Sequence, residues 1–411
     1  MTDLPHSSGT GTMRRPRAAA LTACLLAALL AGALLAACDP RDDTRTAAGA
    51  AGLGGSGGSG AGPDAGVPVT AVRLQLQWFT QAQFAGYIAA RDKGFYADVG
   101  LAVEILEGGT EIVPQEVLAQ GRADFAIAWV PKALAAREQG ARITDVGQIF
   151  QRSGTWQVSF ADAGIRQPAD LRGRRVGTWG FGNEFELFAG MAGAGLDPGA
   201  DATLVQQEFD VTALLSGEID AAAAMSYNEY AQILEAENPR TGRLYTSEDL
   251  AVIDWNDVGT AMLQDAVWAS TPRLESDPAY RRTTTRFLEA SLRGWAYCRD
   301  NARECRDLVV AAGSQLGASH QLWQMNEVNK LVWPSPQGIG VIDQASWQRT
   351  VEIARGTRNA DGRAVLRADP AGPAYTNEFA REALANLRAA DVDVTGESFE
   401  PIEVTPSPGG G

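Results

Sequence analysis

The feature that most constrains this chain is a regular alternation of short apolar strands with helical segments. The alternation runs from residue 72 to 150 and starts again from residue 175 to 255. Such a pattern is typical of mainly parallel sheets with helices on both faces. In the first run the expected strands are 72–78, 102–106, 125–129 and 145–150, and the expected helices are 84–94, 113–120 and 131–138.

The second run predicts a second unit of the same kind. Its expected strands are 175–178, 203–207, 221–226 and 252–255, with helices 183–194, 211–215 and 229–235 between them. Two extended apolar segments, 156–160 and 261–268, lie at the seams and are expected to be crossovers.

The remaining apolar residues recur every three or four positions from 277 to 387, which predicts helices that pack back onto the first unit. We therefore expect an α/β fold of two lobes, each a mainly parallel sheet flanked by helices. The expected order is lobe 1 from 70 to 160, lobe 2 from 161 to 260, a return to lobe 1 from 261 to 390, and a tail from 391 to 411.

Charge excludes one broad class of partner. The chain of 411 residues has a formal net charge of −15, and residues 1–37 hold three arginines and one aspartate, so the remainder is more acidic still. Its only lysines are Lys93, Lys132 and Lys330. Because affinity for nucleic acid depends on Lys and Arg neutralising phosphates, a nucleic-acid partner is not expected.

The N-terminus predicts export. Arg14, Arg15 and Arg17 precede an apolar run from 18 to 33, and Leu-Ala-Ala-Cys38 follows, which resembles the lipobox of bacterial lipoproteins. We expect residues 1–37 to be a signal peptide, Cys38 to carry the lipid, and the Gly-, Ala- and Ser-rich segment 38–69 to be a flexible tether. The protein would then be extracytoplasmic and anchored to the cell membrane. Simple cleavage with an incidental cysteine is the alternative.

Two cysteines, Cys298 and Cys305, would remain in an oxidising compartment besides the lipidated one, so a disulfide between them is expected. On one straight helix residues seven apart are separated by about 10 Å, which is too far for a bridge. The chain must therefore turn near 300–302. Two unpaired thiols are the alternative.

Candidate ligand contacts lie where strands end, because ligands of open α/β sheets bind at the carboxyl ends of strands. In lobe 1 these positions hold Trp78, Phe79 and Gln83, then Trp129. Gln151, Arg152 and Ser153 follow the last strand of the first run and offer amide, guanidinium and hydroxyl groups. The alternatives are core packing for Trp78 and Trp129, and a structural ion pair for Arg152.

The glycine-rich stretch from 177 to 186 joins a strand to a helix and is the candidate wall of lobe 2. Its glycines allow positive φ and close backbone approach, and the helix start leaves N–H groups free. Glu184 could accept N–H bonds from a ring, but the helix dipole alone also explains a carboxylate there. The candidate contacts are Trp179, Phe181, Gly182, Asn183 and Glu184.

Four segments together carry a family resemblance: QLQWFTQAQFAGYIAARDKGFYADVGLAVEILEGG, ADFAIAWVPKALAAREQG, QIFQRSG and GRRVGTWGFGN. They resemble substrate-binding proteins of ABC importers, in the branch named for the thiamine-pyrimidine synthases of fungi, which includes sulfonate and nitrate binders. The resemblance extends from residue 72 to about 387. It implies a type II periplasmic-binding-protein-like fold, lobe closure over a small ligand, and an ABC permease with its ATPase as partners of a monomer. It also places Tyr227, Asn228 and Asp257 at the cleft.

The resemblance favours a thiamine-related pyrimidine as ligand, and ten tryptophans favour a flat ring over a small anion. Riboflavin, a sulfonate or nitrate in the same role, and a synthase-type enzyme are the alternatives. Catalysis is not expected, because the cysteine-rich motif of the synthases is absent. No cofactor or metal is expected, since His320 is the only histidine besides His6. His320 itself is expected to be a surface or helix-cap residue.

Overall fold

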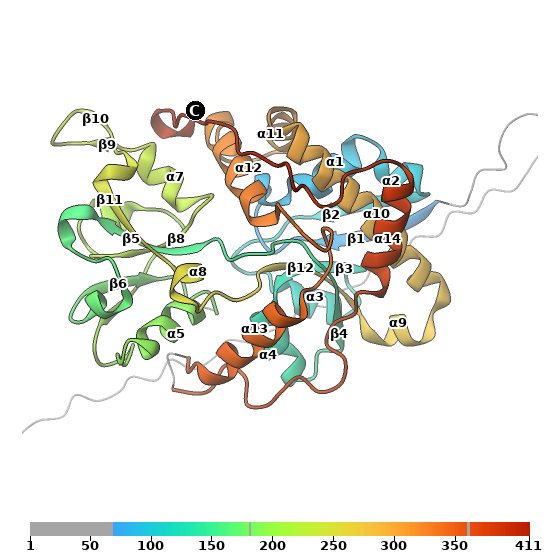
Figure 1. Ribbon diagram of the computed structural model, residues 1–411, viewed down its shortest axis with the longest axis horizontal. Coiled ribbons are helices and arrows are strands. Elements are labelled where there is room, and N and C mark those ends of the chain that lie inside the picture. Colours follow the sequence, from blue (N-terminus) through green and yellow to red (C-terminus); the bar gives the residue numbers. More distant parts are fainter. Residues whose placement is uncertain (1–68, 181, 360–361) are drawn as a thin grey trace, which may run out of the picture. The chain divides into compact units, whose positions relative to one another are not determined.

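The computed structural model describes residues 69–180, 182–359 and 362–411, which all belong to one compact unit (Figure 1). The expected signal peptide, Cys38, nearly all of the tether and Phe181 lie outside the described residues.

Lobe 1 is built on a five-stranded sheet in the order β2-β1-β3-β12-β4. Strand β1 pairs in parallel with β2 and β3, whereas β12 runs antiparallel to β3 and β4, so the sheet is mainly parallel. Strands β3 and β4 are buried along their whole length. The strand bounds are β1 Thr70–Gln75, β2 Leu101–Leu106, β3 Phe125–Trp129, β4 Ile143–Gln148 and β12 Asp265–Ser270.

Lobe 2 repeats this arrangement. A three-stranded sheet, β11-β5-β8, is connected by a bridge between Val176 and Ala221 to the parallel pair β6-β7. Here β5 is the antiparallel strand, as β12 is in lobe 1. The bounds are β5 Thr155–Phe160, β6 Arg175–Thr178, β7 Thr203–Gln206, β8 Ala222–Met225 and β11 Leu250–Asp254, with a small hairpin of β9 Glu237–Asn238 and β10 Arg243–Leu244.

The two connections between lobes differ from the expectation. The apolar segments predicted as crossovers are the antiparallel strands themselves, β5 in the sheet of lobe 2 and β12 in that of lobe 1. Each pairs on both edges, so its backbone groups are hydrogen-bonded within the sheet. The chain crosses just before each strand, at 149–154 and 259–264, so the boundary after residue 160 falls earlier than expected.

Helices cover both sheets, and the C-terminal helices return to lobe 1 (Figure 1). Helices α1 and α10 cross closely at two glycines: a Cβ on Gly294 would lie 2.0 Å from the carbonyl oxygen of Gly86. The helices of lobe 1 before the first crossing are α1 Ala85–Asp92, α2 Phe95–Asp98, α3 Pro114–Ala119 and α4 Val130–Glu138. Those of lobe 2 are α5 Phe185–Gly193, α6 Thr212–Leu215, α7 Glu229–Leu234 and α8 Trp255–Val258. The later helices are α9 Thr271–Ser276, α10 Pro278–Asp300, α11 Ala302–Ala311, α12 Ala318–Val332, α13 Gln344–Gly356 and α14 Glu378–Ala389.

Cys298 and Cys305 form a disulfide, with their Cα atoms 5.5 Å apart. The chain turns at Asn301, between α10 and α11, where the spacing of the two cysteines required a turn. The bridge therefore fixes the corner between these two helices.

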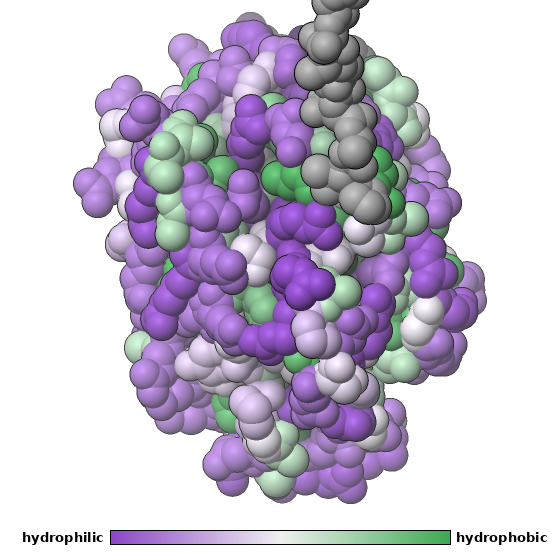
Figure 2. Space-filling model, turned by 90° about the vertical axis from the view of Figure 1, so that its right-hand side faces the viewer, coloured by the Kyte–Doolittle hydropathy of each residue, from purple (hydrophilic) through white to green (hydrophobic). Residues whose placement is uncertain are grey.

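Within the described ranges, no helix combines the length and apolarity needed to cross a membrane. The face shown in Figure 2 is mostly hydrophilic, with apolar residues in small patches.

Candidate ligand-binding site

A cavity of about 620 Å³ opens between the two lobes. Its wall consists of loops at the carboxyl ends of strands: those after β1, β2 and β3 in lobe 1, and those after β6, β7 and β8 in lobe 2. This is the edge at which open α/β sheets bind ligands. The fold thus brings six loops, three from each lobe, around one space.

Aromatic rings from both lobes lie along this cavity. Trp78 of lobe 1 packs against Phe209 of lobe 2, with ring centroids 4.3 Å apart. Phe209 is stacked in turn with Trp179, at 5.9 Å and an interplanar angle of 13°. The indole N–H of Trp179 donates to the carbonyl oxygen of Glu208, which fixes the ring. These rings provide flat apolar surfaces suited to a planar ligand.

Asp265, the first residue of β12, organises the wall of lobe 1 from behind. Its carboxylate accepts hydrogen bonds from Gln77 Nε2 at 2.6 Å, Gln83 Nε2 at 2.9 Å and Trp129 Nε1 at 2.8 Å. Burial raises its pKa to about 6, while these bonds and nearby Lys132 act in the opposite direction. The carboxyl is therefore mostly ionised at neutral pH and holds three cavity-lining side chains in place.

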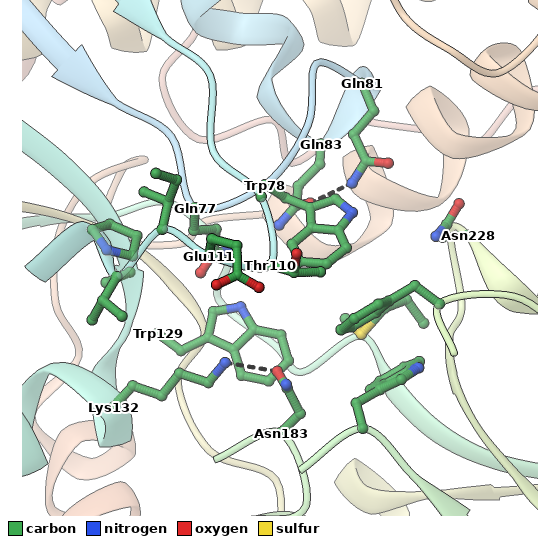
Figure 3. Close-up of a pocket in the computed structure, with 18 of the residues that line it drawn as sticks. Gln77, Trp78, Gln81, Gln83, Thr110, Glu111, Trp129, Lys132, Asn183 and Asn228 are labelled. Atoms are coloured by element: carbon green, nitrogen blue, oxygen red, sulfur yellow. Dashed lines mark hydrogen bonds between the residues drawn. The ribbon is translucent and has the colours of Figure 1, made fainter. Parts of the chain in front are cut away.

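Lys132, on α4, connects the lobes at one side of the cavity. Its Nζ donates to Asn183 Oδ1 of lobe 2 at 2.7 Å and lies 4.7 Å from the ring centroid of Trp129 (Figure 3). Burial lowers the pKa of Lys132 to about 8, and the carboxylates of Glu184 and Asp265 oppose that shift. Near neutral pH the ammonium thus forms a polar bridge across the cleft.

Asn228 and Glu229 form the polar edge of lobe 2. Asn228 Nδ2 donates to Glu229 Oε1 at 2.7 Å, and Glu229 Oε2 accepts the backbone N–H of Met225 at 2.9 Å. Burial raises the pKa of Glu229. Both side chains line the cavity.

Seven of the residues named from the sequence line this cavity. They are Trp78, Gln83, Trp129, Trp179, Asn183, Tyr227 and Asn228.

Others named from the sequence are placed behind the wall. Phe79 packs edge-on against Trp78, with centroids 5.2 Å apart, and supports that ring. The Glu184 carboxylate is turned back to accept the backbone N–H of Gly182 at 3.0 Å, in the loop before helix α5. Burial raises the pKa of Glu184. Neither Gly182 nor Glu184 is among the cavity-lining residues.

The segment from Gln151 to Ser153 is a hinge rather than a cavity wall, which revises the expectation for all three residues. Arg152 donates to backbone carbonyls at and beyond the end of α12, among them Leu331 and Pro334, and so caps that helix. Gln151 bonds Gln148 of its own strand. These polar groups satisfy backbone atoms where the chain leaves lobe 1.

Ser153 anchors the other side of the same hinge. Its hydroxyl donates to Glu186 Oε2 at 2.7 Å, and Glu186 Oε1 accepts the N–H of Met262 in the second crossing segment. Burial raises the pKa of Glu186 to about 8. Asp257 is exposed on α8 outside the cavity, while its neighbour Asn256 exchanges hydrogen bonds with the backbone of Ser153.

The expectation for His320 is wrong. Only 1% of it is exposed, and its ring nitrogens contact Glu235 and Asn228. The helical pattern around His320 predicts a helix that packs on lobe 1 alone. In the structure α12 lies between the lobes, and its first turn, which holds His320, packs against α7 and is buried.

Sequence reasoning missed several functional candidates because no local pattern marks them. The only hint of Asp265 in the sequence is a single carboxylate at the start of an apolar strand. Lys132 follows the named Trp129 by three residues and sits on its ring. Phe209 lies in a polar loop after β7 and gave no signal. In the described part of the chain, no three His, Cys, Asp or Glu side chains are grouped as metal ligands would be.

Two similar lobes around a cleft of strand-end loops define the class of two-lobed periplasmic binding proteins. A solved structure of a sulfonate ABC transporter periplasmic sulfonate-binding protein from Methylobacillus flagellatus has this fold, with a TM-score of 0.57 at 17% identity, covering 78% of this chain and 96% of that one. The chain belongs to the NMT1/THI5 like family, whose model matches residues 81–305.

Two relatives match most of the chain. The riboflavin-binding protein RibY of Chloroflexus aurantiacus is 27% identical over 330 residues, covering 77% of this chain and 88% of the relative. The formylaminopyrimidine-binding protein of Halalkalibacterium halodurans is 22% identical over 287 residues, covering 68% of this chain and 83% of that relative.

Proposed function

We propose that this protein is the extracytoplasmic solute-binding component of an ABC importer. It captures a small pyrimidine-related heteroaromatic molecule by closure of its lobes and delivers it to a permease and its ATPase. Family membership and the named ligands of two relatives support this role.

The observation that carries the proposal is the composition of the cavity wall. Trp78, Phe209 and Trp179 provide ring faces from both lobes, and amide side chains surround them. Among the described lining residues Lys132 is the only Lys or Arg, whereas three are glutamates: Glu111, Glu208 and Glu229. Such a wall suits an uncharged or weakly basic ring with a polar edge, and it disfavours a sulfonate or nitrate.

A thiamine-related pyrimidine is the first candidate, and riboflavin is the second. The cavity volume of about 620 Å³ favours riboflavin, because this volume exceeds what a single pyrimidine ring fills. Riboflavin also carries a pyrimidine ring within its fused system, so the same amides could pair with either ligand.

Binding without turnover is part of the proposal. The one lysine of the cavity wall is engaged with Asn183 and Trp129, which suits it to hold the lobes together. A synthase-type enzyme would carry a bound pyridoxal chromophore, and we expect the purified protein to show no such absorbance band.

The membrane attachment is proposed from the N-terminal sequence. Removal of residues 1–37 would leave Cys38 to receive the lipid, with residues 38–69 as the tether of a monomeric binding protein. Cys38→Ala is expected to release the protein from the membrane fraction, whereas a variant that stays membrane-bound would contradict lipid anchoring.

A thermal-shift screen tests the function. Formylaminopyrimidine, thiamine, riboflavin and taurine are each added to the purified protein. A true ligand at one hundred times its Kd adds about 2.7 kcal/mol to the free energy of unfolding. We expect a rise in Tm with at least one heteroaromatic compound and none with taurine. No shift with any heteroaromatic compound, or a shift with taurine alone, would overturn the proposal.

A further inference from the structure

His320 bridges the lobes on the side of the cavity opposite to lobe 1's tryptophans. It lies in the first turn of α12, which packs on α11 and on the short helix Ala82–Phe84 of lobe 1. Its Nδ1 lies 2.9 Å from Glu235 Oε2, and its Nε2 lies 3.0 Å from Asn228 Oδ1. Asn228 directly precedes α7 of lobe 2, and Glu235 directly follows it. The ring therefore makes a cross-lobe contact directly behind Asn228, which lines the cavity.

The hydrogen-bond network fixes which atom of Asn228 faces the ring. Asn228 Nδ2 donates to Glu229 Oε1, so the amide oxygen is left for His320. The other oxygen of the Glu229 carboxyl group accepts the backbone N–H of Met225. Turning the amide over would place its carbonyl oxygen against the Glu229 carboxylate. The observed orientation of the Asn228 amide thus avoids contact between its carbonyl oxygen and the Glu229 carboxyl oxygen.

Both ring nitrogens of His320 consequently face acceptors: a carboxylate at Nδ1 and an amide oxygen at Nε2. Only the imidazolium has an N–H at both positions, since each neutral tautomer has a lone pair at one of them. The ring is 1% exposed, so bulk water does not supply the donor that the lone pair of a neutral ring would need.

The charged groups around the ring agree with a cation. From α7, Glu235 contacts it directly and Glu229 acts on it through space, while from α11 Arg306 pairs with Asp307 and donates to the carbonyl oxygen of Ala318. Glu327 and Lys330 on α12 itself pair with each other, and the C-terminal segment contributes backbone at Gly410. The short helix Ala82–Phe84 contributes no ionisable side chain. Two carboxylates thus act on the ring, and Arg306 is engaged with Asp307 and a backbone carbonyl.

We propose that His320 is a positioning residue which, as an imidazolium, holds Asn228 and Glu229 at the polar edge of the ligand site only when the lobes are closed. The inference rests on the proposed function of the cleft. Loss of the proton leaves a lone pair against an acceptor, which weakens the closed state. Ligand affinity therefore falls when the ring loses its second N–H.

The protonation state can be tested without a ligand. Without residues 1–37, His320 is the only histidine of the sequence, so a ¹H–¹⁵N spectrum of its imidazole ring needs no further assignment and should show both nitrogens protonated at pH 7. A neutral ring with one protonated nitrogen would overturn the inference, whatever the ligand proves to be.

The positioning role is tested by riboflavin and formylaminopyrimidine titrations from pH 6 to 9. His320→Gln keeps one donor and cannot become a cation, so we expect about tenfold weaker binding at pH 6 and a pH profile that keeps only the fall near pH 8 expected from Lys132. Ser319→Ala on the same turn is the matched control and should follow the wild type.

The outcomes separate the two proposals. A wild type that binds neither probe contradicts the proposed function, whereas a wild type and His320→Gln with equal affinities and equal pH profiles contradict the role of His320 alone. If His320→Gln does not fold, the imidazole spectrum decides.

Discussion

The two walls of the cleft are fastened in different ways. In lobe 1, Asp265 holds Gln77, Gln83 and Trp129 from within the same lobe. In lobe 2, the amides of Asn183 and Asn228 bond to Lys132 of lobe 1 and to His320 of α12, the helix between the lobes. The first wall is therefore held by contacts within one lobe, and the second by contacts across the cleft.

This difference suggests a division of labour in binding. A wall that is ordered in advance loses little conformational freedom on contact with a ligand. A wall that is ordered by closure contributes its contacts only in the closed state, and so couples ligand binding to the shape that a permease would recognise.

The largest effect on ligand affinity is expected from Asp265→Asn, which disturbs the hydrogen bonds that hold Gln77, Gln83 and Trp129. An amide at this position offers one acceptor atom to three donors and adds an N–H₂ group among them. Hydrogen bonds to charged groups contribute about 1.5–3 kcal/mol each, so we expect ligand affinity to fall by about a hundredfold in calorimetric titrations. Asp145→Asn, a buried carboxyl on neighbouring β4, is the control and should leave affinity unchanged. Equal losses in both variants would count against the special role of Asp265.

Removing a ring from the second wall should have the next largest effect. Trp179→Ala deletes the face stacked on Phe209 and is expected to weaken binding of a flat ligand by about tenfold to a hundredfold. Quenching of tryptophan fluorescence by riboflavin gives the affinity. Trp156→Ala, in the same lobe but outside the cavity, is the matched variant, and its affinity should equal that of the wild type. Unchanged ligand affinity in Trp179→Ala would show that Trp179 serves only the packing of the core and does not contact the ligand.

The Lys132 bridge is expected to contribute less, because one hydrogen bond is at stake. Lys132→Met and Asn183→Ala should each weaken binding about fivefold, and their double-mutant cycle should show a coupling of about 1 kcal/mol. Affinity of the wild type should also fall as the pH rises through about 8, where Lys132 loses its proton. Additive effects in the cycle would show that the two residues act separately.

The smallest effect is expected at the hinge between the walls. The folded state raises the pKa of Glu186 from its ordinary 4.5 to about 8, so between these values the folded protein binds a proton that the unfolded chain releases. Stability thus falls as the pH rises from about 4.5 to about 8. We expect Tm to be higher by about 3 °C at pH 5.5 than at pH 8, and Glu186→Gln to reduce that difference. An unchanged pH dependence in Glu186→Gln would assign it to other groups.

Much of the fold could be predicted from the sequence because the signal is local. Alternating strands and helices gave both lobes, and strand-end positions gave Trp78, Trp129 and Trp179 at the cavity. The same rule failed at Arg152, which also follows a strand. A strand-end position does not reveal whether the next residues face the cleft or carry the chain to the other lobe.

The residues that fasten the walls could not be predicted, because their roles depend on contacts between distant parts of the chain. Asp265 lies 188 positions from Gln77, and His320 lies 92 positions from Asn228. Neither has a spacing motif, and each looks like an isolated polar residue in an apolar or helical context.

The most direct test of the two-wall account is a crystal structure of the protein with the heteroaromatic compound that gives the largest thermal shift. The account predicts the ring inside this cavity, in contact with aromatic side chains of both lobes and with Trp78 still packed against Phe209. The contacts of Lys132 with Asn183 and of His320 with Asn228 would be kept. A ligand bound outside this cavity, or inside it with both cross-lobe contacts broken, would contradict the account.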